Sequence, residues 1–433
     1  MTTLQSKSLT SDLSRQVSII TAVTTNSVRM LFQKTKIISS EFEKVNRLIS
    51  NNNIEDLTTT VSVLIENIAE FLEEYSFDET KAQTDKKGLE SACIILNSTI
   101  RHHNLVNIKS SIKALATAFT QRIDQLLLGQ IKRLVNIFEN ENSHASLMCT
   151  LSGLAGLGLQ AAHLANLLAR CSGITALLAL CINSQSASVR TAALRILATV
   201  CCSSSSIMQF EMGGGLEIMC DILSDHDRGE LEQCEAASVI AQVTAPWLDH
   251  GQTVHNIEKH LSALISALTE LIKRSASHET LLVCAAALAN ISWAEPRSVW
   301  LLVENSSAGA LLVAVRSQGP KACVFLREQA ATLLANMSAV SEIRSHLAQH
   351  RAVPALLCFL QVSHSPLHSP AEIGAAYRVQ HKSAIALSRL CSEPEAANQV
   401  IQLQGVSSLV RLCREERERN NSDGVLVACL VNN

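Results

Sequence analysis

The phrase Ala193-Leu-Arg-Ile-Leu-Ala-Thr-Val200 recurs as Ala236-Ala-Ser-Val-Ile-Ala-Gln-Val243. Three further copies follow, at Ala286–Ile291, Ala331–Met337 and Ala384–Leu390. From the final apolar residue of one copy to that of the next, the steps are 43, 48, 46 and 53 residues. A weaker copy, Leu151–Leu157, ends 43 residues before Val200. Helical self-similarity at this period predicts a solenoid in which each repeat packs on its neighbours.

A second apolar helix precedes each copy of the phrase. These segments are Gly173–Cys181, Gly215–Leu223, Leu261–Leu268, Gly309–Val315, Val353–Leu360 and Gly405–Cys413. Glycine at the start of such a helix permits a sharp turn out of the helix before it. Alanine in the quoted phrase lets successive repeats approach closely. The fold class is therefore all-α, with about six armadillo-like repeats in a superhelical solenoid over residues 144–430.

The composition excludes several classes of function. A net charge of −3 gives no general attraction to nucleic acid or to an anionic membrane. The 14 cysteines include no Cys-x-x-Cys pair, so we expect small buried side chains in a reducing compartment, with no metal and no cofactor. The uncharged stretch from Asn142 to Ala169 carries His, Gln, Asn and Gly. It predicts buried repeat helices, and we expect no membrane span.

Residues 13–140 predict a helical hairpin or small bundle. In residues 13–49, apolar positions alternate three and four apart, which is the seam of one helix packing along another. That segment has six basic and two acidic residues, whereas residues 54–79 have eight acids and no Lys or Arg. Antiparallel pairing of the two helices would bury both seams and offset both charges. A third helical region then runs from Leu89 to Glu139.

We expect the seam to form an assembly interface through Val28, Leu31, Ile38, Phe42 and Val45. It is about 30 Å long, and the helix from Ile54 to Tyr75 covers only part of it. Exchange between two copies of the chain, or packing against a partner's repeats, would cover the rest. The alternative is that Leu105–Phe138 folds back and closes the bundle within one chain.

Two asparagines suggest a peptide-binding groove. Asn290 and Asn336 occupy the same point of the repeated phrase, one residue before its final apolar position. An amide side chain is both donor and acceptor, which matches the backbone of an extended peptide. Replacing both by Ala should then spare the fold and weaken binding. The alternative is a local cap or core hydrogen bond, and Thr199, Gln242 and Arg389 stand at the same point elsewhere. Trp293 would stack on a ligand side chain or pack in the core.

Basic residues accompany the repeated phrase. They are Arg190, Arg195, Arg327, Arg378, Lys382 and Arg389. Lining a concave face, they would suit an acidic ligand. Glu230, Glu232 and Glu235 interrupt the row, and a solvated surface is the alternative.

Four segments resemble one known family. They are Leu288–Ser292, Leu334–Ser338, Ala371–Gln380 and Glu418–Leu430, and they are similar to the armadillo region of the Inscuteable family. The resemblance implies a cytoplasmic adaptor at the apical cell cortex in asymmetric cell division. It also implies two partners, the tetratricopeptide repeats of a Pins/LGN-type protein and a Bazooka-type polarity scaffold.

Residues 1–12 resemble the end of that family's partner-binding peptide. The resemblance assigns partner contacts to Leu4, Gln5 and Lys7, and we expect Leu4–Thr10 to be extended when bound and disordered otherwise. Both ends of the chain look truncated relative to the family.

No enzymatic motif accompanies these features. The sequence has no Gly-x-Ser-x-Gly, no P-loop and no His-Glu-x-x-His. We therefore expect a non-enzymatic adaptor. The alternative is an importin-like solenoid for cargo recognition, which would need fuller Trp-Asn arrays than Trp293 with Asn290 and Asn336 provide.

Overall fold

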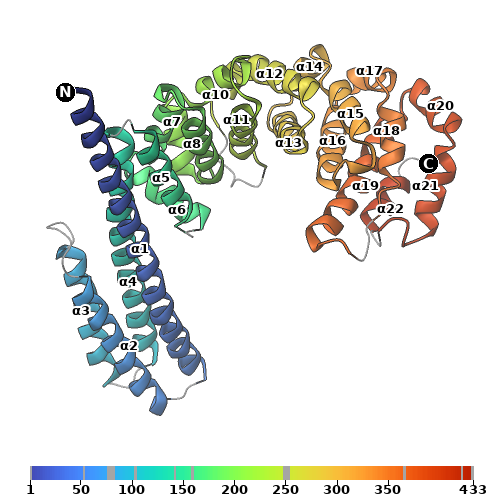
Figure 1. The fold of residues 1–433 in the computed structure, drawn as a ribbon. Coiled ribbons are helices and arrows are strands. Elements are labelled where there is room, and N and C mark those ends of the chain that lie inside the picture. The colour runs from blue at the N-terminus through green and yellow to red at the C-terminus, as the bar shows by residue number, and fades with distance from the viewer. Residues whose placement is uncertain are drawn as a thin grey trace. The chain divides into compact units, whose positions relative to one another are not determined.

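The computed structural model describes residues 2–51, 54–75, 83–101, 105–140, 143–157, 160–246, 254–363, 367–420 and 423–430. Every regular element within these ranges is a helix (Figure 1), which confirms the predicted fold class. The chain divides into two compact units, Met1–Ala176 and Leu177–Asn433.

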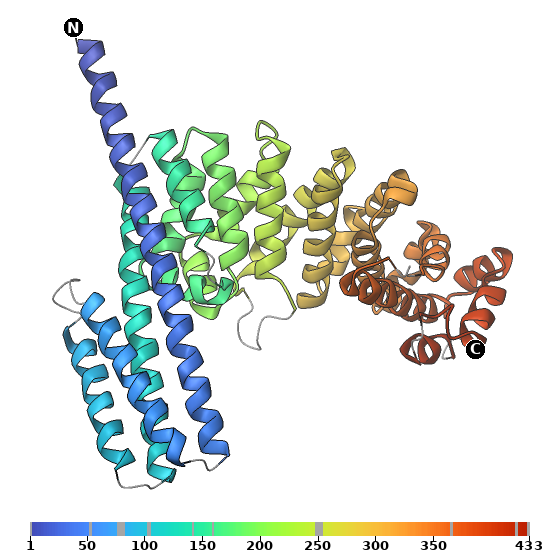
Figure 2. The same cartoon turned by 60° about the horizontal axis from the view of Figure 1, so that its bottom comes forward.

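The N-terminal unit is built from long helices. They are α1 (Thr2–Ser50), α2 (Ile54–Glu74), α3 (Gln83–Ile100) and α4 (Leu105–Asn140), followed by the shorter α5 (His144–Ala155) and α6 (Ala161–Arg170). The first glycine is Gly88 and the first proline is Pro246, so nothing in the sequence breaks α1 over its 49 residues. Helices α1 to α4 lie side by side as a bundle (Figure 2).

The core of the bundle closes within one chain. Phe119 of α4 packs against Phe42 of α1 and Phe71 of α2, with ring centroids 6.0 and 5.3 Å apart. Arg122, also on α4, is buried and donates from Nη2 to the carbonyl oxygen of Tyr75 at 2.9 Å. A cation at the C-terminal end of α2 is favourably placed against the helix dipole. Lys34 of α1 also meets Glu74 of α2 at 3.0 Å, as the opposite charges of the two helices predicted.

This closure removes the reason for expecting an assembly interface at the seam. Val28, Leu31, Ile38, Phe42 and Val45 are all buried by other helices of the same chain. The inference that the seam stays uncovered was wrong, because α4 folds back along α1 and covers what α2 leaves open. The alternative weighed from the sequence is the arrangement observed.

The disorder expected for Leu4–Thr10 without a partner is not observed, and an extended form on the partner stays a prediction. These residues belong to α1, which begins at Thr2. Extending a helix costs far less than starting one, and no Gly or Pro interrupts the segment. The side chains of Leu4, Gln5 and Lys7 lie outside the described residues.

Helices α5 and α6 pack on the bundle. Thr150 of α5 lies 3.3 Å from Thr21 of α1, measured between the Oγ1 atoms. His163 of α6 contacts Asp124 of α4, with Nε2 and Oδ1 2.9 Å apart. The weak copy Leu151–Leu157 thus includes the end of a helix that packs on α1, and the boundary between the two units falls at Ala176, later than the 140–144 expected.

The second unit is a stack of helical repeats. It comprises α8 (Ala187–Val200), α9 (Ser204–Met212), α10 (Gly215–Ser224), α11 (Glu230–Val243), α12 (Leu261–Arg274), α13 (His278–Ala294), α14 (Ser298–Glu304), α15 (Ser307–Gln318), α16 (Val324–Met337), α17 (Arg344–Gln349), α18 (Ala352–Phe359), α19 (Pro370–Leu390), α20 (Pro394–Gln402), α21 (Gly405–Arg414) and α22 (Asp423–Leu430), with short 3₁₀ turns η1 (Ile257–Lys259), η2 (Gly319–Lys321) and η3 (Ser341–Ile343). Helix α7 (Gly173–Asn183) spans the boundary.

The repeated phrase forms the third helix of each repeat. Helices α8, α11, α13, α16 and α19 pack on one another in succession (Figure 1), and we call them the third-helix layer. The second helices include α10, α12, α15, α18 and α21. Alanines of the phrase, such as Ala236, Ala331 and Ala384, are fully buried in the layer. Small side chains allow this close approach, as the sequence predicted.

The turn into each second helix differs from the expectation. The positive φ falls on the residue before the helix, at Ser172, Gly214, Ser306, Arg351 and Gln404, with values of 55–71°. Glycine at the first helical position serves close packing instead. A Cβ atom on Gly215 would lie 2.5 Å from Cδ2 of the buried Phe210.

This contact predicts the effect of Gly215→Ala. The added methyl group has no room beside Phe210, so we expect the free energy of unfolding to fall by about 1–3 kcal/mol. The control is Gly309→Ala in α15, where a Cβ meets nothing within 4 Å. There the better helix propensity of alanine should leave stability unchanged or raise it by up to about 1 kcal/mol. Urea denaturation measures both, and equal effects would contradict the packing role of Gly215.

Candidate functional site

A ladder of hydrogen bonds joins successive third helices. Asn290 of α13 donates from Nδ2 to the carbonyl oxygen of Ala241 in α11 at 2.9 Å. Asn336 of α16 donates to Ala289 of α13 at 3.1 Å. Arg389 of α19 donates from Nη1 to Ala335 of α16 at 2.6 Å. Each acceptor stands one residue before the equivalent position of the preceding repeat, and we call this set the inter-repeat ladder.

The ladder bears directly on the predicted peptide clamp. Asn290 is only 8% exposed, and Asn336 also donates to Oγ of Ser292 at 2.9 Å. One amide hydrogen of Asn290 and both of Asn336 are therefore bonded to the preceding repeat rather than directed at a ligand. The arrangement is the alternative weighed from the sequence, a core hydrogen bond. Thr199, at the same point of α8, instead donates to Arg195 of its own helix.

Trp293 lies in the last turn of α13, three residues after Asn290. Its side chain is 65% exposed, so the structure does not place it in the core. An exposed tryptophan beside the ladder is available to stack on a ligand side chain. That contact stays a prediction.

Three of the six residues of the predicted basic row are paired with glutamates inside the solenoid. Arg190 of α8 makes two bonds to Glu232 of α11, Nε to Oε1 at 2.7 Å and Nη2 to Oε2 at 2.8 Å. Arg195 likewise donates from Nε to Glu235 of α11 at 2.7 Å. Two of the three acids that seemed to interrupt the row, Glu232 and Glu235, are thus partners of its arginines, whereas Glu230 accepts from Oγ of Ser275. Arg190 and Arg195 are therefore already paired and do not form a free surface for an acidic ligand. The partners are 42 and 40 residues apart, close to one repeat, and this spacing could have revealed them in the sequence.

The same pairing recurs further along the layer. Arg378 of α19 makes a two-bond pair with Glu328 of α16, at 2.5 and 3.0 Å. Lys382, one turn later, is half-buried and has no ion pair among the described residues. Arg327, in the first turn of α16, donates to the carbonyl oxygen of Gly319 at 3.3 Å. Of the six basic residues expected to line one face, these three are thus in three different settings.

Glu232 is the most enclosed of these acids. Its side chain is 2% exposed and accepts bonds from both Arg190 and Arg228. Burial alone would raise the pKa of this carboxyl. The hydrogen bonds and charges of the two guanidinium groups outweigh burial and hold the pKa of Glu232 below its ordinary value.

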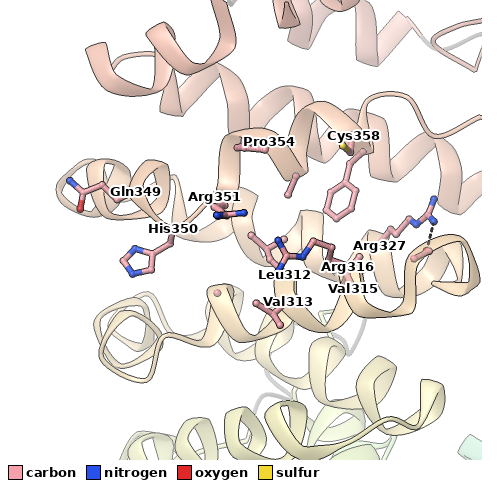
Figure 3. A pocket seen from close by; sticks show the side chains of 14 residues that line it. Leu312, Val313, Val315, Arg316, Arg327, Gln349, His350, Arg351, Pro354 and Cys358 are labelled. Carbon is pink, nitrogen blue, oxygen red and sulfur yellow. Dashed lines mark hydrogen bonds between the residues drawn. The ribbon is translucent and has the colours of Figure 1, made fainter. Parts of the chain in front are cut away.

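A groove lies between second helices α15 and α18. Its volume is about 990 Å³, and Figure 3 shows its lining side chains. They are Leu312, Val313, Val315, Arg316, Arg327, Gln349, His350, Arg351, Pro354, Ala355, Cys358 and Phe359, with Gly309 and Gly319. Arg327 was singled out in the sequence, whereas Arg316 and Arg351 were not. They lie in a second helix and the turn before one, outside the repeated phrase that drew attention.

The described residues contain no group of three His, Cys, Asp or Glu side chains that could hold a metal ion. His346 and His350, one helical turn apart, stack with ring centroids 4.0 Å from each other. Among the described residues, no single helix is long and apolar enough to cross a membrane. Two pairs of helices, α6 with α7 and α14 with α15, are together long and apolar enough, but each pair is sharply bent.

Comparison with known proteins identifies the family. The profile of the family described as "Protein inscuteable C-terminal" matches residues 23–433. The chain belongs to the Inscuteable family. It is 29% identical to the mouse (Mus musculus) Protein inscuteable homolog over 420 residues, which is 93% of this chain and 72% of the mouse protein. The human (Homo sapiens) homolog is 32% identical over 325 residues, covering 75% of this chain and 56% of the human protein.

Solved structures share the fold. An engineered protein matches 90% of this chain and 98% of its own length, with a TM-score of 0.55 and 16% sequence identity. A designed armadillo repeat protein matches 60% of this chain and 99% of its own, with a TM-score of 0.48 and 23% identity. The first likeness agrees with the stacked helices described above.

The inter-repeat ladder predicts that Asn290→Ala and Asn336→Ala destabilise the solenoid. Asn290→Ala removes the side-chain donor to the carbonyl oxygen of Ala241, at a cost of about 1–3 kcal/mol in the free energy of unfolding. Asn336→Ala removes the donor to Ala289 and to Oγ of Ser292, and it should cost less, because Oγ of Ser292 still donates to the carbonyl oxygen of Ala289 at 2.7 Å. This reverses the effect expected from the sequence, where the double change was to spare the fold. Thr199→Ala is the control, since Thr199 is exposed and bonds only within its own helix. Urea denaturation should show a smaller effect there, and full stability of both asparagine variants would disprove the structural role.

Glu232 predicts a pH dependence of stability. Its folded-state pKa is lowered, so its stabilising effect is fully present above the ordinary carboxyl pKa of about 4.3 and is lost as the pH falls through the lower folded value. We expect Glu232→Gln to cost about 3 kcal/mol at pH 7 and to remove that acid step. Glu270→Gln, which breaks the exposed pair with Lys273, should cost no more than about 0.5 kcal/mol. Urea denaturation from pH 3 to 7 tests both, and identical acid profiles for wild type and Glu232→Gln would contradict it.

Proposed function

We propose that this protein is an adaptor that links a Bazooka-type polarity scaffold to the tetratricopeptide repeats of a Pins/LGN-type protein at the apical cell cortex of asymmetrically dividing cells. The observation that carries the proposal is the family match over residues 23–433. An adaptor needs more than one binding surface, and the division of this chain into a helical bundle and a solenoid of repeats is consistent with that need.

Family membership and fold support an adaptor role rather than catalysis. In the described residues the buried charges serve structure: Glu232 and Glu235 hold Arg190 and Arg195 across successive third helices. The importin-like alternative required asparagine amides that face a bound peptide. The commitment of Asn290 and Asn336 to the inter-repeat ladder speaks against that use.

We also propose that the N-terminal helices mediate self-association, through residues of α1 other than the buried seam. Phe42 and Val45 are core residues, whereas Ile19, Val23 and Met30 of the same helix are exposed. Exposed apolar side chains on one helix are available to a second copy. Light scattering of wild type and of Val23→Asp with Met30→Asp measures this, and an unchanged mass would remove the idea.

The Pins-type contact is tested by deletion. We expect removal of residues 1–12, which include Leu4, Gln5 and Lys7, to weaken binding to a Pins/LGN-type tetratricopeptide domain at least tenfold, because this segment resembles the end of the family's partner-binding peptide. Isothermal titration calorimetry of both proteins gives the affinities. A basic nuclear-localisation peptide is the competing ligand. Binding of that peptide without binding of the repeat domain would favour cargo recognition over the adaptor.

A further inference from the structure

The groove between α15 and α18 combines an apolar floor with a basic rim. Val315 and Phe359 are buried beneath it, and Leu312 and Pro354 are half-buried along its sides. Val313, on the open side, is exposed. The walls are second helices of successive repeats, so the groove lies where two repeats meet and runs alongside these two helices (Figure 3).

Three arginines line this groove, and no acid does. Arg316 comes from α15, Arg351 from the turn before α18 and Arg327 from the start of α16. None of the three has an ion pair among the described residues, although Arg327 donates to a carbonyl oxygen. By contrast, Arg190, Arg195 and Arg378 of the third-helix layer are each paired with a glutamate. In a chain of net charge −3, the groove is thus a local concentration of unneutralised positive charge.

Arg351 is fixed by its backbone. It has a φ of 63°, a conformation that non-glycine residues seldom adopt. The tight turn between α17 and α18 imposes it, and α18 begins at the next residue. The turn therefore sets the direction of the Cα–Cβ bond of Arg351, whose exposed side chain lines the groove.

We propose that this groove binds a short acidic segment of a partner protein, with an apolar side chain on the floor and carboxylates at Arg316 and Arg351. Arginine pairs with carboxylates through two parallel hydrogen bonds, which gives orientation as well as attraction. A phosphate or nucleic acid would meet the cations but would leave the apolar floor uncovered. A purely apolar helix would leave the arginines unpaired.

The dimensions limit the length of the segment. Helix α15 has 12 residues and α18 has eight. At 1.5 Å per residue they are about 18 and 12 Å long. The groove thus accommodates about two to three turns of an amphipathic helix. This is the helix-in-groove mode, in which apolar anchors recur at helical spacing.

The site is independent of the Pins-type contact proposed above. A failure at this groove leaves that proposal standing, because the deletion of residues 1–12 and the groove variants change different units of the chain.

The experiment selects the ligand from a defined library. A display library of random 12-residue peptides is panned on the intact chain, and the best binders are made with a fluorescein label for anisotropy titration. We expect enrichment of Asp and Glu together with large apolar residues. Arg316→Glu combined with Arg351→Glu should weaken the selected peptides at least tenfold. The matched control, Arg297→Glu with Arg417→Glu, changes the net charge equally at exposed arginines outside the groove and should change affinity by less than twofold.

A second variant separates shape from charge. Cys358 is exposed on the groove wall, and Cys358→Trp fills the space without altering charge. It should also weaken the peptides at least tenfold, while circular dichroism and thermal melting show an intact fold. Peptides without acidic enrichment, or peptides that bind the Arg316/Arg351 variant as tightly as wild type, would overturn the proposal. So would full binding to Cys358→Trp.

Discussion

The solenoid depends on the contact between one third helix and the next. Buried alanines such as Ala331 and Ala384 let these helices approach until a side chain on one reaches the backbone of the other. Asn290, Asn336 and Arg389 then donate to carbonyl oxygens one repeat back. A buried donor left without a partner is costly, so this ladder couples the repeats to each other as well as to their own helices.

The same contacts between repeats determine which arginines of the solenoid have a glutamate partner and which do not. Along the third-helix layer Arg190, Arg195 and Arg378 are each paired with a glutamate of a neighbouring repeat, as in the enclosed pair of Arg190 and Glu232. Between the second helices α15 and α18 no acid stands opposite Arg316 and Arg351. On the third-helix layer, where the sequence predicted ligand contacts, Asn290, Asn336 and Arg190 instead bond to neighbouring repeats and stabilise the solenoid. The unpaired arginines that would select an acidic ligand lie in the groove between the second helices α15 and α18.

In the N-terminal unit, the fold likewise depends on which helices cover an apolar surface. Its long α1 has more apolar surface than α2 can cover, and α4 supplies the remainder through Phe119 and the helix-capping Arg122. The seam was readable in the sequence because apolar residues recur at helical spacing. Its partner was not, because two helices were available to cover it and spacing alone does not choose between them.

The sequence by itself determined the helices, the repeat period and the family, since each is written in local spacing or in short matching segments. It also marked Asn290, Asn336 and Arg389 as equivalent positions. Only the tertiary structure decided that these side chains bond to the preceding repeat. It also decided that Glu232 and Glu235 pair with Arg190 and Arg195. Arg316 and Arg351, by contrast, have no ion pair among the described residues. The physical reason is distance along the chain. The hydrogen-bonding partners of these side chains lie 40 to 54 residues away in the sequence, and only packing of the repeats brings them together.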